Sequence, residues 1–587
     1  MEGFAKYSTL LFSILLFIFL LSFLRYTHTY YFFALEQNEL FVYSWHYYIK
    51  GELMQPGGLS QLIGSFMTQF FIFPFAGPAI TAGLFTLIWY MIILICRRIA
   101  KGTISFLPAF IPVFFLIIIQ LDYNYMIQGS VAYLLMLFAL YIYTHIAKFN
   151  SRILTGLIII PFLFWWAGSI TSLFAVCIVL WEMFCRPPKA YTIVLIVAEV
   201  LLISFGSVYF TFLGEYRFAF LPDLYYSQEI NPSLTLYYAW VALPLILLLM
   251  WLLRRWDPQK KITLFILYTL QVACIVLLTR QGILMSIDWE SAYLMKYDYH
   301  TRKHQWDRII SSLQGPQDDY LSMCYLNMAL AQKGLLAEKA FHFDQKGNEG
   351  LIIPWNQTIA TSTLLSDVYF TIGNTGMSQA MAFENNINSY FNGKPRMIQR
   401  LVQTNLIYGA WTVAGKYLNI LENTLFYKEW AKEHRKFLHT DELVINDPLL
   451  GSKRMDLIAK NHLSGPWDIR IDLHAIASHN PQNTIAVEYL GMAYLLSRNL
   501  TGFNDYLHMY YPPTENMHLP ASFQEAFLLI YEEDPLKLQE YNISESIMNR
   551  FKEYRIFFEQ NQNNPAFAQM AYRSYGDTYW FYNFFKR

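Results

Sequence analysis

The sequence predicts an all-α protein in two parts: a polytopic bundle of about nine transmembrane helices, then a soluble domain of tetratricopeptide-like (TPR-like) helical repeats. Three observations predict this fold class. Residues 1–285 contain long uncharged apolar runs, residues 286–587 have an ordinary soluble composition, and the second half recurrently shows a helix–turn–helix pattern. Only 15% of all residues are charged, against roughly 25% in typical soluble proteins. We therefore expect a transmembrane domain over 1–280 and a soluble α-helical domain over 281–587.

The transmembrane domain is predicted from apolar runs that are long enough to cross a bilayer. A spanning helix needs about 20 apolar residues, because the hydrocarbon core offers no partner to an unpaired backbone group. A further apolar stretch, 59–74, is interpreted as an interfacial or re-entrant helix, since a crossing there would reverse every later loop. The predicted spans cover residues 7–24, 77–96, 104–121, 129–147, 153–168, 170–185, 190–213, 235–253 and 262–279.

The basic residues between the predicted spans set the expected orientation. Twelve lie on the side where the chain begins and four lie in the opposite short loops. The positive-inside rule assigns the richer side to the cytoplasm, so residues 281–587 are expected outside. The richer side carries Lys6, Arg97, Arg98, Lys101, Lys148, Arg152, Arg186, Lys189, Arg254, Arg255, Lys260 and Lys261, and the other side carries Arg25, Lys50, Arg217 and Arg280.

The large first external loop, residues 25–76, holds the candidate catalytic groups. On a helix, Glu36 and Glu39 share one face and His46 continues it. A carboxylate at the membrane surface suits a general base or a metal ligand acting on a lipid-linked substrate. The alternative is the solvated face of an interfacial amphipathic helix.

Further carboxylates lie in predicted external loops on the same side of the membrane, and besides Asp223 they include Asp122 and Glu215. Loops at one end of a helical bundle can converge on one cavity, so these two residues and His46 are candidate substrate-binding groups. No cofactor is evident from the sequence. The gathered carboxylates nevertheless allow a divalent metal ion, because hard cations prefer oxygen ligands.

The soluble half is predicted to consist of helical hairpins. Small residues beside a glycine or polar turn let two helices approach in the segments that begin at Tyr325, Val368, Leu406 and Glu488. Their spacing is irregular, without the full 34-residue repeat, and such stacks usually present a groove to a protein partner. The aromatic segment 575–585 is expected to pack against the soluble core or to rest on the membrane.

The soluble half also excludes several functions. It contains no phosphate-binding glycine loop, no HExxH motif and no GxSxG motif. The whole chain has 43 basic and 43 acidic residues, so no overall positive field favours nucleic acid as a partner.

Several distinctive strings are spread along the chain: Gln55-Pro-Gly-Gly-Leu, Thr68-Gln-Phe-Phe, Tyr325-Leu-Asn-Met-Ala-Leu, Ala486-Val-Glu-Tyr-Leu, Gln524-Glu-Ala-Phe-Leu-Leu and Tyr575-Gly-Asp-Thr-Tyr-Trp-Phe-Tyr. Together they resemble an uncharacterised family of multi-pass membrane proteins common in Bacteroidota. The resemblance covers nearly the whole chain. It implies a bacterial inner-membrane location with the second half in the periplasm, and it implies no activity.

The order of the predicted elements also resembles GT-C glycosyltransferases, which have a large first external loop and often an external soluble domain. In that family a carboxylate of the first loop serves as base or metal ligand, and the donor is a polyprenyl-phosphate sugar. Glu36 and Glu39 occupy the comparable place here, but the paired acidic motif of the family is absent.

These features lead to two main functional hypotheses. In the first, the chain is a GT-C-like transferase of the cell envelope that uses Glu36 or Glu39 as base and a polyprenyl-linked saccharide as donor. In the second, it is a non-enzymatic scaffold, anchored in the bilayer, whose periplasmic repeats bind a protein partner. A transporter is less favoured, because the spans show no paired broken helices.

Overall fold

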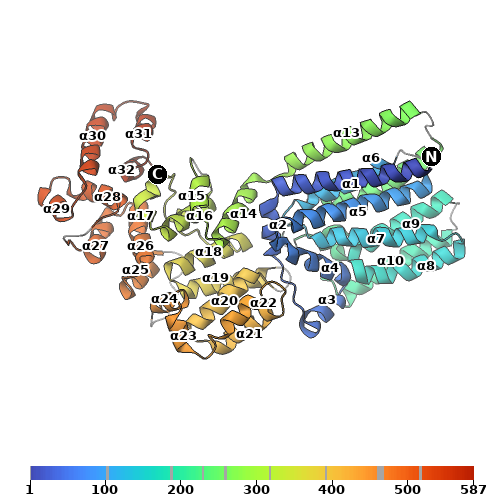
Figure 1. Ribbon diagram of the computed structural model, residues 1–587, viewed down its shortest axis with the longest axis horizontal. Helices are drawn as coiled ribbons and strands as arrows, with labels where there is room; N and C mark the ends of the chain where they lie inside the picture. Colours follow the sequence, from blue (N-terminus) through green and yellow to red (C-terminus); the bar gives the residue numbers. More distant parts are fainter. Residues whose placement is uncertain are drawn as a thin grey trace. The chain divides into compact units, whose positions relative to one another are not determined.

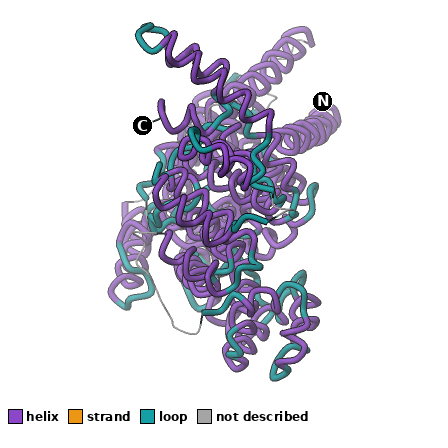
Figure 2. The backbone as a smooth tube through the Cα atoms, turned by 90° about the vertical axis from the view of Figure 1, so that its left-hand side faces the viewer, coloured by secondary structure: helices purple, strands orange, loops and turns teal. Residues whose placement is uncertain are grey.

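The chain folds into two compact units (Figure 1). We call them the membrane unit, Met1–Ala292 with Asn423–Leu425, and the C-terminal unit, Tyr293–Glu422 with Phe426–Arg587. Within its described part the chain forms helices and loops, without any β-strand (Figure 2), which confirms the all-α class. The computed structural model describes residues 2–100, 105–185, 190–227, 230–256, 261–315, 319–389, 393–458, 469–514 and 518–586.

The membrane unit combines long apolar helices with short helices in the connections between them. The long helices α1, α5 and α7 run side by side in Figure 1. Its elements are α1 (Glu2–Thr27), α2 (Thr29–Glu36), the π-helix η1 (Trp45–Ile49), α3 (Lys50–Leu53), α4 (Gly58–Thr68), η2 (Gln69–Ile72), α5 (Ala76–Ile99), α6 (Phe106–Gln120), α7 (Ile127–His145), α8 (Phe149–Ala167), η3 (Gly168–Ile170), α9 (Thr171–Cys185), α10 (Ala190–Tyr209), α11 (Tyr216–Phe220), η4 (Pro222–Tyr225), α12 (Leu234–Leu252), η5 (Leu253–Arg255) and α13 (Lys261–Ser286).

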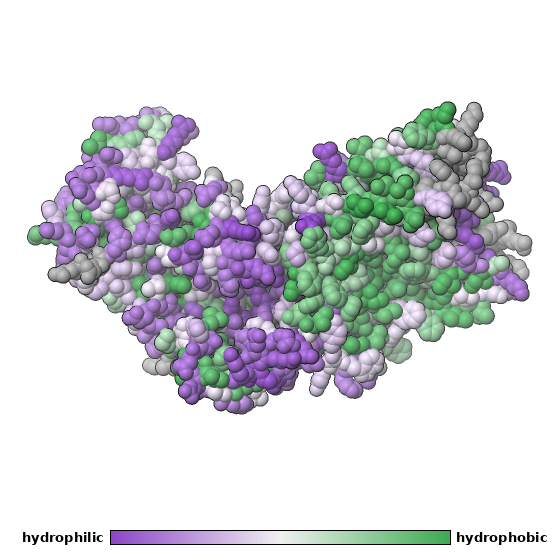
Figure 3. Space-filling model, in the orientation of Figure 1, coloured by the Kyte–Doolittle hydropathy of each residue, from purple (hydrophilic) through white to green (hydrophobic). Residues whose placement is uncertain are grey.

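Seven helical runs in the described residues are long and apolar enough to cross a membrane. Only 22% of the first run and 17% of the last are buried within the protein. Such an apolar surface needs lipid to cover it, and Figure 3 shows it as a broad hydrophobic area over the membrane unit. The runs are Thr9–Thr27, Ala76–Ile99, Ile127–His145, Phe149–Phe184, Ala190–Tyr209, Leu234–Arg255 and Phe265–Gly282.

The predicted number of nine spans is therefore wrong as a count of separate runs, and one reason is that the fifth and sixth predicted spans, which are both present as helices, are joined in one run. Residues 153–168 and 170–185 belong to a single helical run, because α8 continues through η3 into α9. Arg152 near the start of α8 nevertheless binds Glu182 near the end of α9 at 2.6 Å. The run therefore folds back on itself as a hairpin, with its bend at Gly168, whose φ of 62° favours glycine.

The other reason lies in the third predicted span. It corresponds to α6, whose 15 residues rise only about 22 Å at about 1.5 Å per residue. The stretch 59–74 holds α4, with 11 residues, followed directly by the four residues of η2. At about 1.5 Å per residue in α4 and about 2.0 Å in η2 the two rise roughly 25 Å, against a hydrocarbon core about 30 Å thick. That this stretch is interfacial or re-entrant stays a prediction.

Basic side chains gather at one end of the membrane unit, which we call the basic end. Arg97 at the end of α5 donates a hydrogen bond to Thr9 Oγ1 at 2.5 Å. Arg98 donates to the carbonyl of Thr144 at the end of α7 at 3.1 Å, and Arg152 begins α8 beside them. The side of the membrane that this end faces stays a prediction. Four other basic residues of the predicted cytoplasmic loops, Lys101, Arg186, Lys189 and Lys260, lie outside the described residues.

The C-terminal unit consists of helices of unequal length. The four predicted hairpin segments do form helix–turn–helix pairs, but α17 has four residues and α18 has 14. A regular TPR-like repeat is therefore not confirmed. The α-helices are α14 (Trp289–Arg302), α15 (Trp306–Ser312), α16 (Tyr320–Gln332), α17 (Leu336–Lys339), α18 (Ile359–Ile372), α19 (Thr375–Asn388), α20 (Pro395–Ile407), α21 (Trp411–Glu422), α22 (Lys428–Arg435), α23 (Asp441–Asn446), α24 (Leu450–Met455), α25 (Ile469–His479), α26 (Thr484–Leu496), α27 (Leu500–Tyr510), α28 (Ala521–Tyr531), α29 (Pro535–Glu540), α30 (Glu545–Asn561), α31 (Phe567–Tyr575) and α32 (Tyr579–Phe585).

The aromatic segment at the end of the chain packs into the core of the C-terminal unit. Tyr579 and Trp580 are fully buried there. The indole Nε1 of Trp580 donates to the carbonyl of Glu525 at 2.8 Å, and the Tyr582 hydroxyl donates to the carbonyl of Leu496 at 2.8 Å. Of the two alternatives predicted for this segment, packing against the soluble core is therefore the one observed.

Candidate functional site

The candidate site lies at the end of the membrane unit opposite the basic end, which we call the polar end. Here the loop 28–75 packs on the connections that join the long helices. The amide of Gly57 donates to the carbonyl of Phe164 at 3.2 Å, at the end of α8. The amide of Met126, just before α7, donates to the carbonyl of Tyr225 at 3.0 Å. Segments far apart in the sequence therefore build one polar layer.

Glu39 is the carboxylate most firmly placed within this layer. Its two oxygens accept hydrogen bonds from Gln128 Nε2 at 2.9 and 3.0 Å, and Oε2 also accepts from Thr68 Oγ1 at 3.0 Å. The same amide nitrogen lies 3.3 Å from Ser65 Oγ. Ser65 and Thr68 belong to α4 and Gln128 begins α7. Two helices therefore hold one partly buried carboxylate in a defined orientation.

A close approach of α4 to α7 makes this arrangement possible. A Cβ atom added to Gly64 would lie 2.6 Å from Gln128 Cγ and 3.1 Å from its Cα, which is closer than carbon atoms pack. The buried face of α4 also carries Ser60, Ser65 and Thr68. Small and polar residues on the buried face of an otherwise apolar helix are the sequence signal that could have identified Ser65, Thr68 and their partner Gln128.

Burial controls the protonation of the acidic groups around this carboxylate. Burial raises the pKa of Glu39, although its hydrogen bonds from Gln128 and Thr68 oppose the rise. Burial also raises the pKa of Glu52, and the nearby charge of Glu39 adds to that rise. The pKa of the Tyr48 phenol is raised by burial and then by both carboxylates. A proton is therefore held more firmly here than on exposed carboxyl groups.

Two buried polar atoms near Glu39 are incompletely bonded within the described residues: Gln128 Oε1 has no hydrogen-bond partner there, and the Tyr48 hydroxyl has at most the Ser65 side chain. The side chains are well enclosed, since Tyr48 is 3% and Gln128 1% exposed. Buried polar groups are normally hydrogen-bonded, and an orphaned group costs free energy. These atoms therefore offer binding capacity for a polar group that the protein does not itself supply.

The structure corrects the expected relation between Glu36 and Glu39. Helix α2 ends at Glu36, and Glu39 follows in a non-helical segment, so the two do not share a helical face. Asn38 accepts a hydrogen bond from the Tyr123 hydroxyl at 2.8 Å, which draws this segment onto the α6–α7 connection. Glu36 itself is 3% exposed and accepts from Gln37 Nε2 at 2.7 Å.

The three predicted substrate-binding residues occupy different surroundings. Asp122 lies in the α6–α7 connection and accepts from the Tyr226 hydroxyl at 2.6 Å and from Asn124 at 3.0 Å, close to the Asn38 contact. Glu215 is exposed and forms a local ion pair with Arg217 at 2.8 Å. His46 is exposed on the π-helix η1. The structure therefore brings Asp122, but not Glu215 or His46, into the layer around Glu39.

The acidic groups of this site do not form a recognisable metal cluster. Over the described ranges of the chain, no three His, Cys, Asp or Glu side chains are placed to hold a metal ion together. The donor set at Glu39 consists instead of one amide and one hydroxyl, with Glu52 nearby. These groups suit the holding and transfer of a proton.

The seven apolar helices and the buried polar layer at one end define a polytopic membrane protein with a soluble-type helical unit at its carboxyl end. The chain belongs to the family described as "Family of unknown function (DUF6057)", whose profile matches residues 4–586. This membership confirms the resemblance to an uncharacterised family. No curated protein and no solved structure shows significant similarity to the chain.

Proposed function

We propose that this chain is a membrane-bound transferase, similar in design to GT-C glycosyltransferases, with Glu39 as its general base. The observation that carries the proposal is the environment of the Glu39 carboxylate. It is partly buried at the polar end, oriented by Gln128 and Thr68, and close to the unpartnered Gln128 Oε1. A carboxylate whose pKa is raised by burial is a better base at neutral pH than an exposed one.

In the proposed reaction, an acceptor hydroxyl transfers its proton to Glu39 while its oxygen bonds to the anomeric carbon of the donor sugar. The bond between that carbon and the phosphate oxygen of the polyprenyl carrier breaks, and its electron pair leaves with the lipid phosphate. Glu39 then releases the proton to water. The exposed apolar surface of the bundle supports a lipid-linked donor, because the lipid tail can remain in the bilayer.

The proposal assigns different roles to the other predicted residues. Glu36 and Asp122 already have hydrogen-bond partners within the protein, so both act as positioning residues for the loop that carries Glu39. His46 and Glu215 are exposed at the polar end and retain their predicted contribution to substrate binding.

The proposed location follows from the distribution of basic residues. Arg97, Arg98 and Arg152 meet at the basic end, which the positive-inside rule assigns to the cytoplasm. The polar end then faces the periplasm, where the C-terminal unit presents the acceptor. A bacterial inner membrane is the expected site.

The test compares the glycoconjugates of cells that carry the wild-type chain, Glu39→Gln or Glu290→Gln. Glutamine keeps the size of Glu39 and removes its ability to accept a proton. Glu290 is an exposed carboxylate of the same unit and serves as the matched control. We expect Glu39→Gln to lose a glycan product by about 100-fold or more, as general-base removal typically does, while Glu290→Gln keeps it.

Protein levels in the membrane fraction must be equal for the comparison to hold. An unchanged glycan profile in well-expressed Glu39→Gln cells would refute the transferase. If a periplasmic protein also co-purified with both forms of the chain, the scaffold hypothesis would take its place.

A further inference from the structure

Helix α10 carries an acidic side chain in the middle of one of the apolar runs. Glu199 lies nine residues after Ala190, the first residue of α10, which is about 14 Å along the helix at about 1.5 Å per residue. The whole run has 20 residues and rises about 30 Å, the thickness of a hydrocarbon core. Glu199 therefore lies near the middle of the bilayer, and the reaction proposed for Glu39 does not use it.

The other acidic and basic side chains of the seven described runs lie near the ends of their helices. Charges at helix ends are common, because the ends reach the polar interface. A carboxyl group in the hydrocarbon region is costly, and where a membrane protein keeps one it usually has a function. The residues within four positions of an end are Arg25, Arg97, Arg98, His145, Arg152, Glu182, Arg254, Arg255 and Arg280.

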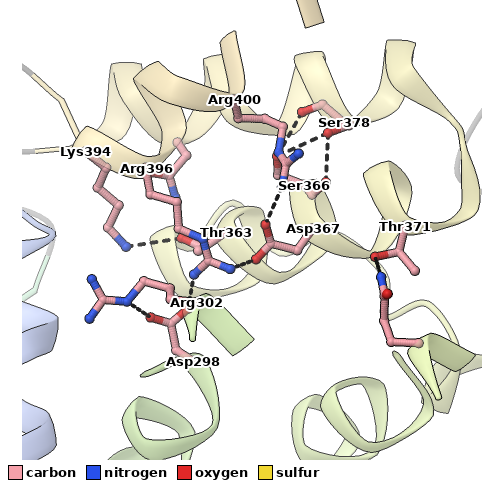
Figure 4. A network of polar contacts seen from close by, with 12 residues as sticks. Asp298, Arg302, Thr363, Ser366, Asp367, Thr371, Ser378, Lys394, Arg396 and Arg400 are labelled. Atoms are coloured by element: carbon pink, nitrogen blue, oxygen red, sulfur yellow. Dashed lines mark hydrogen bonds and ion pairs between the residues drawn. The ribbon is translucent and has the colours of Figure 1, made fainter. Parts of the chain in front are cut away.

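Glu199 also lacks the kind of partner that another buried carboxylate of the chain has. Asp367 of the C-terminal unit is 5% exposed, pairs with Arg396 and bonds Arg400 at 3.0 Å (Figure 4). The Oε2 atom of Glu199 is buried and makes no hydrogen bond to any described residue. An unpaired polar group inside a bilayer costs free energy. A hydrogen-bonding partner from outside the chain would remove this cost.

Glu199 belongs to a stripe of α10 that the rest of the described chain leaves largely uncovered. Leu195 is 48%, Leu202 74% and Tyr209 80% exposed. A Cβ atom added to Gly206 would meet no atom within 4 Å apart from its own helix backbone. These four residues and Glu199 follow one another at steps of four, three, four and three positions, the spacing at which one helix packs along another. We call this stripe the α10 seam.

Two members of the α10 seam favour a protein helix over lipid as its cover. Gly206 has no side chain, so a second helix backbone can approach closely there. When protonated, the carboxyl group of Glu199 both donates and accepts a hydrogen bond. The last torsion of a glutamate side chain has a broad range, so both oxygens can turn towards one partner. Lipid tails offer neither a donor nor an acceptor.

A second copy of the chain is the partner that matches the α10 seam. Copies of one membrane protein insert in the same orientation, so Glu199 lies at the same depth in each. A two-fold axis along the membrane normal, the commonest symmetry of protein dimers, then brings two seams and two carboxyl groups face to face. Two carboxylic acids complete each other's hydrogen bonds, which an apolar partner does not do.

We propose that two copies of this chain associate through the α10 seam, with the two Glu199 carboxyl groups hydrogen-bonded to each other. A single polar residue in an apolar seam also fixes how two helices align. This inference concerns the lipid-facing surface of the membrane unit and does not depend on the role of Glu39.

The first test forms disulfides between copies of the full-length chain in membranes. Leu202→Cys places a thiol in the α10 seam, whereas Leu201→Cys places one at nearly the same depth on another face, since Leu201 is also 40% exposed. A disulfide needs Cβ atoms about 3.5–4.5 Å apart, so we expect oxidation to give at least about five times more dimer in Leu202→Cys. The dimer has twice the 69.0 kDa of one chain, and the wild-type chain, with its own cysteines, gives the background.

The cross-linking result can overturn the proposal in two ways. Equal dimer yields from Leu202→Cys and Leu201→Cys would mean that the copies meet only by collision. A cross-link from Leu202→Cys to a protein of another size, without the dimer, would mean that a different membrane protein covers the α10 seam.

The second test asks whether Glu199 holds the contact. The mass of the purified chain in mild detergent is measured by light scattering over a dilution series. We expect Glu199→Leu to weaken the dimer about fivefold or more, as loss of a hydrogen bond between membrane helices can. Glu199→Gln should keep the dimer, because an amide also donates and accepts, and Leu201→Ala is the matched control. The proposal is overturned if the wild type is a monomer throughout, or if Glu199→Leu dimerises as the wild type does.

Discussion

The hairpin of α8 and α9 gives the sharpest structural prediction, because one buried ion pair closes it. Arg152 Nε and Nη2 bond the two oxygens of Glu182 at 2.6 and 2.7 Å, and the Tyr143 hydroxyl donates to Glu182 at 2.8 Å. The side chains of Arg152 and Glu182 are 10% and 3% exposed. Replacing Arg152 by methionine keeps the bulk of the side chain but leaves the buried carboxylate with a single hydroxyl donor.

The expected cost follows from what breaking such pairs does in other proteins. Removing one partner of a buried ion pair costs about 3–5 kcal/mol, because the other charge remains buried without compensation. With roughly 2–4 °C per kcal/mol for a domain of this size, Arg152→Met should lower the melting temperature by roughly 6–20 °C. The double variant Arg152→Met/Glu182→Met removes both charges and should recover most of that loss.

The assay is thermal unfolding of the purified chain in detergent, followed by intrinsic fluorescence and by loss of monodisperse protein. Arg255→Met is the matched control, because Arg255 is exposed at the same end of the unit. If Arg152→Met and Arg255→Met melt at the same temperature, the ion pair does not hold the hairpin. If the double variant is as unstable as Arg152→Met, the loss does not come from an uncompensated charge.

Three other predictions concern single side chains. Burial raises the pKa of Glu525 to about 8, above its unfolded value, so its contribution to stability is complete below about pH 4.5 and is lost as the pH rises through about 8. With about 1.4 kcal/mol per pKa unit, the lost free energy of unfolding is on the order of 5 kcal/mol. Glu525→Gln should therefore flatten the dependence of the melting temperature on pH between 5 and 9. Equal slopes for the wild type and the variant would contradict this. Gly64→Ala should destabilise the membrane unit by about 1–3 kcal/mol, because its Cβ would meet Gln128 at 2.6 Å. Gly83→Ala, whose Cβ would meet nothing closer than 3.9 Å, should leave the melting temperature unchanged, and equal melting of the two variants would argue against close packing at Gly64. Tyr48→Phe should nearly keep the melting temperature and still lower the glycan product, because the removed hydroxyl has at most the Ser65 side chain as a partner. An unchanged product would show that this hydroxyl binds no substrate.

The membrane unit shows which features of the fold hydropathy predicts and which it does not. Hydropathy placed the apolar runs correctly, because the transfer of a side chain to lipid depends mainly on its own chemistry. It also placed two helices on either side of Gly168, where α8 and α9 form a hairpin, but it did not distinguish a full crossing from the 15 residues of α6. That outcome depends on where a helix begins and ends in the folded chain, and hydropathy does not report this.

The site around Glu39 was also predictable from the sequence only in part. The sequence marked Glu39 because a carboxylate in the first external loop, at the membrane surface, could act as a general base or a metal ligand. It missed Gln128 and Thr68, which lie 89 and 29 residues away from Glu39. Their importance comes from the close approach of α4 to α7.

The sequence by itself determined that this chain has a membrane-embedded first half, an all-helical second half and acidic residues in its first large loop. These properties follow from composition and periodicity, which act locally along the chain. Only the tertiary structure decided that the Glu39 carboxylate is held by side chains of two helices, and that Lys394 is buried with the Thr363 hydroxyl as a hydrogen-bond partner. Burial and hydrogen bonding depend on side chains brought together from distant segments, and those contacts exist only once the helices have packed.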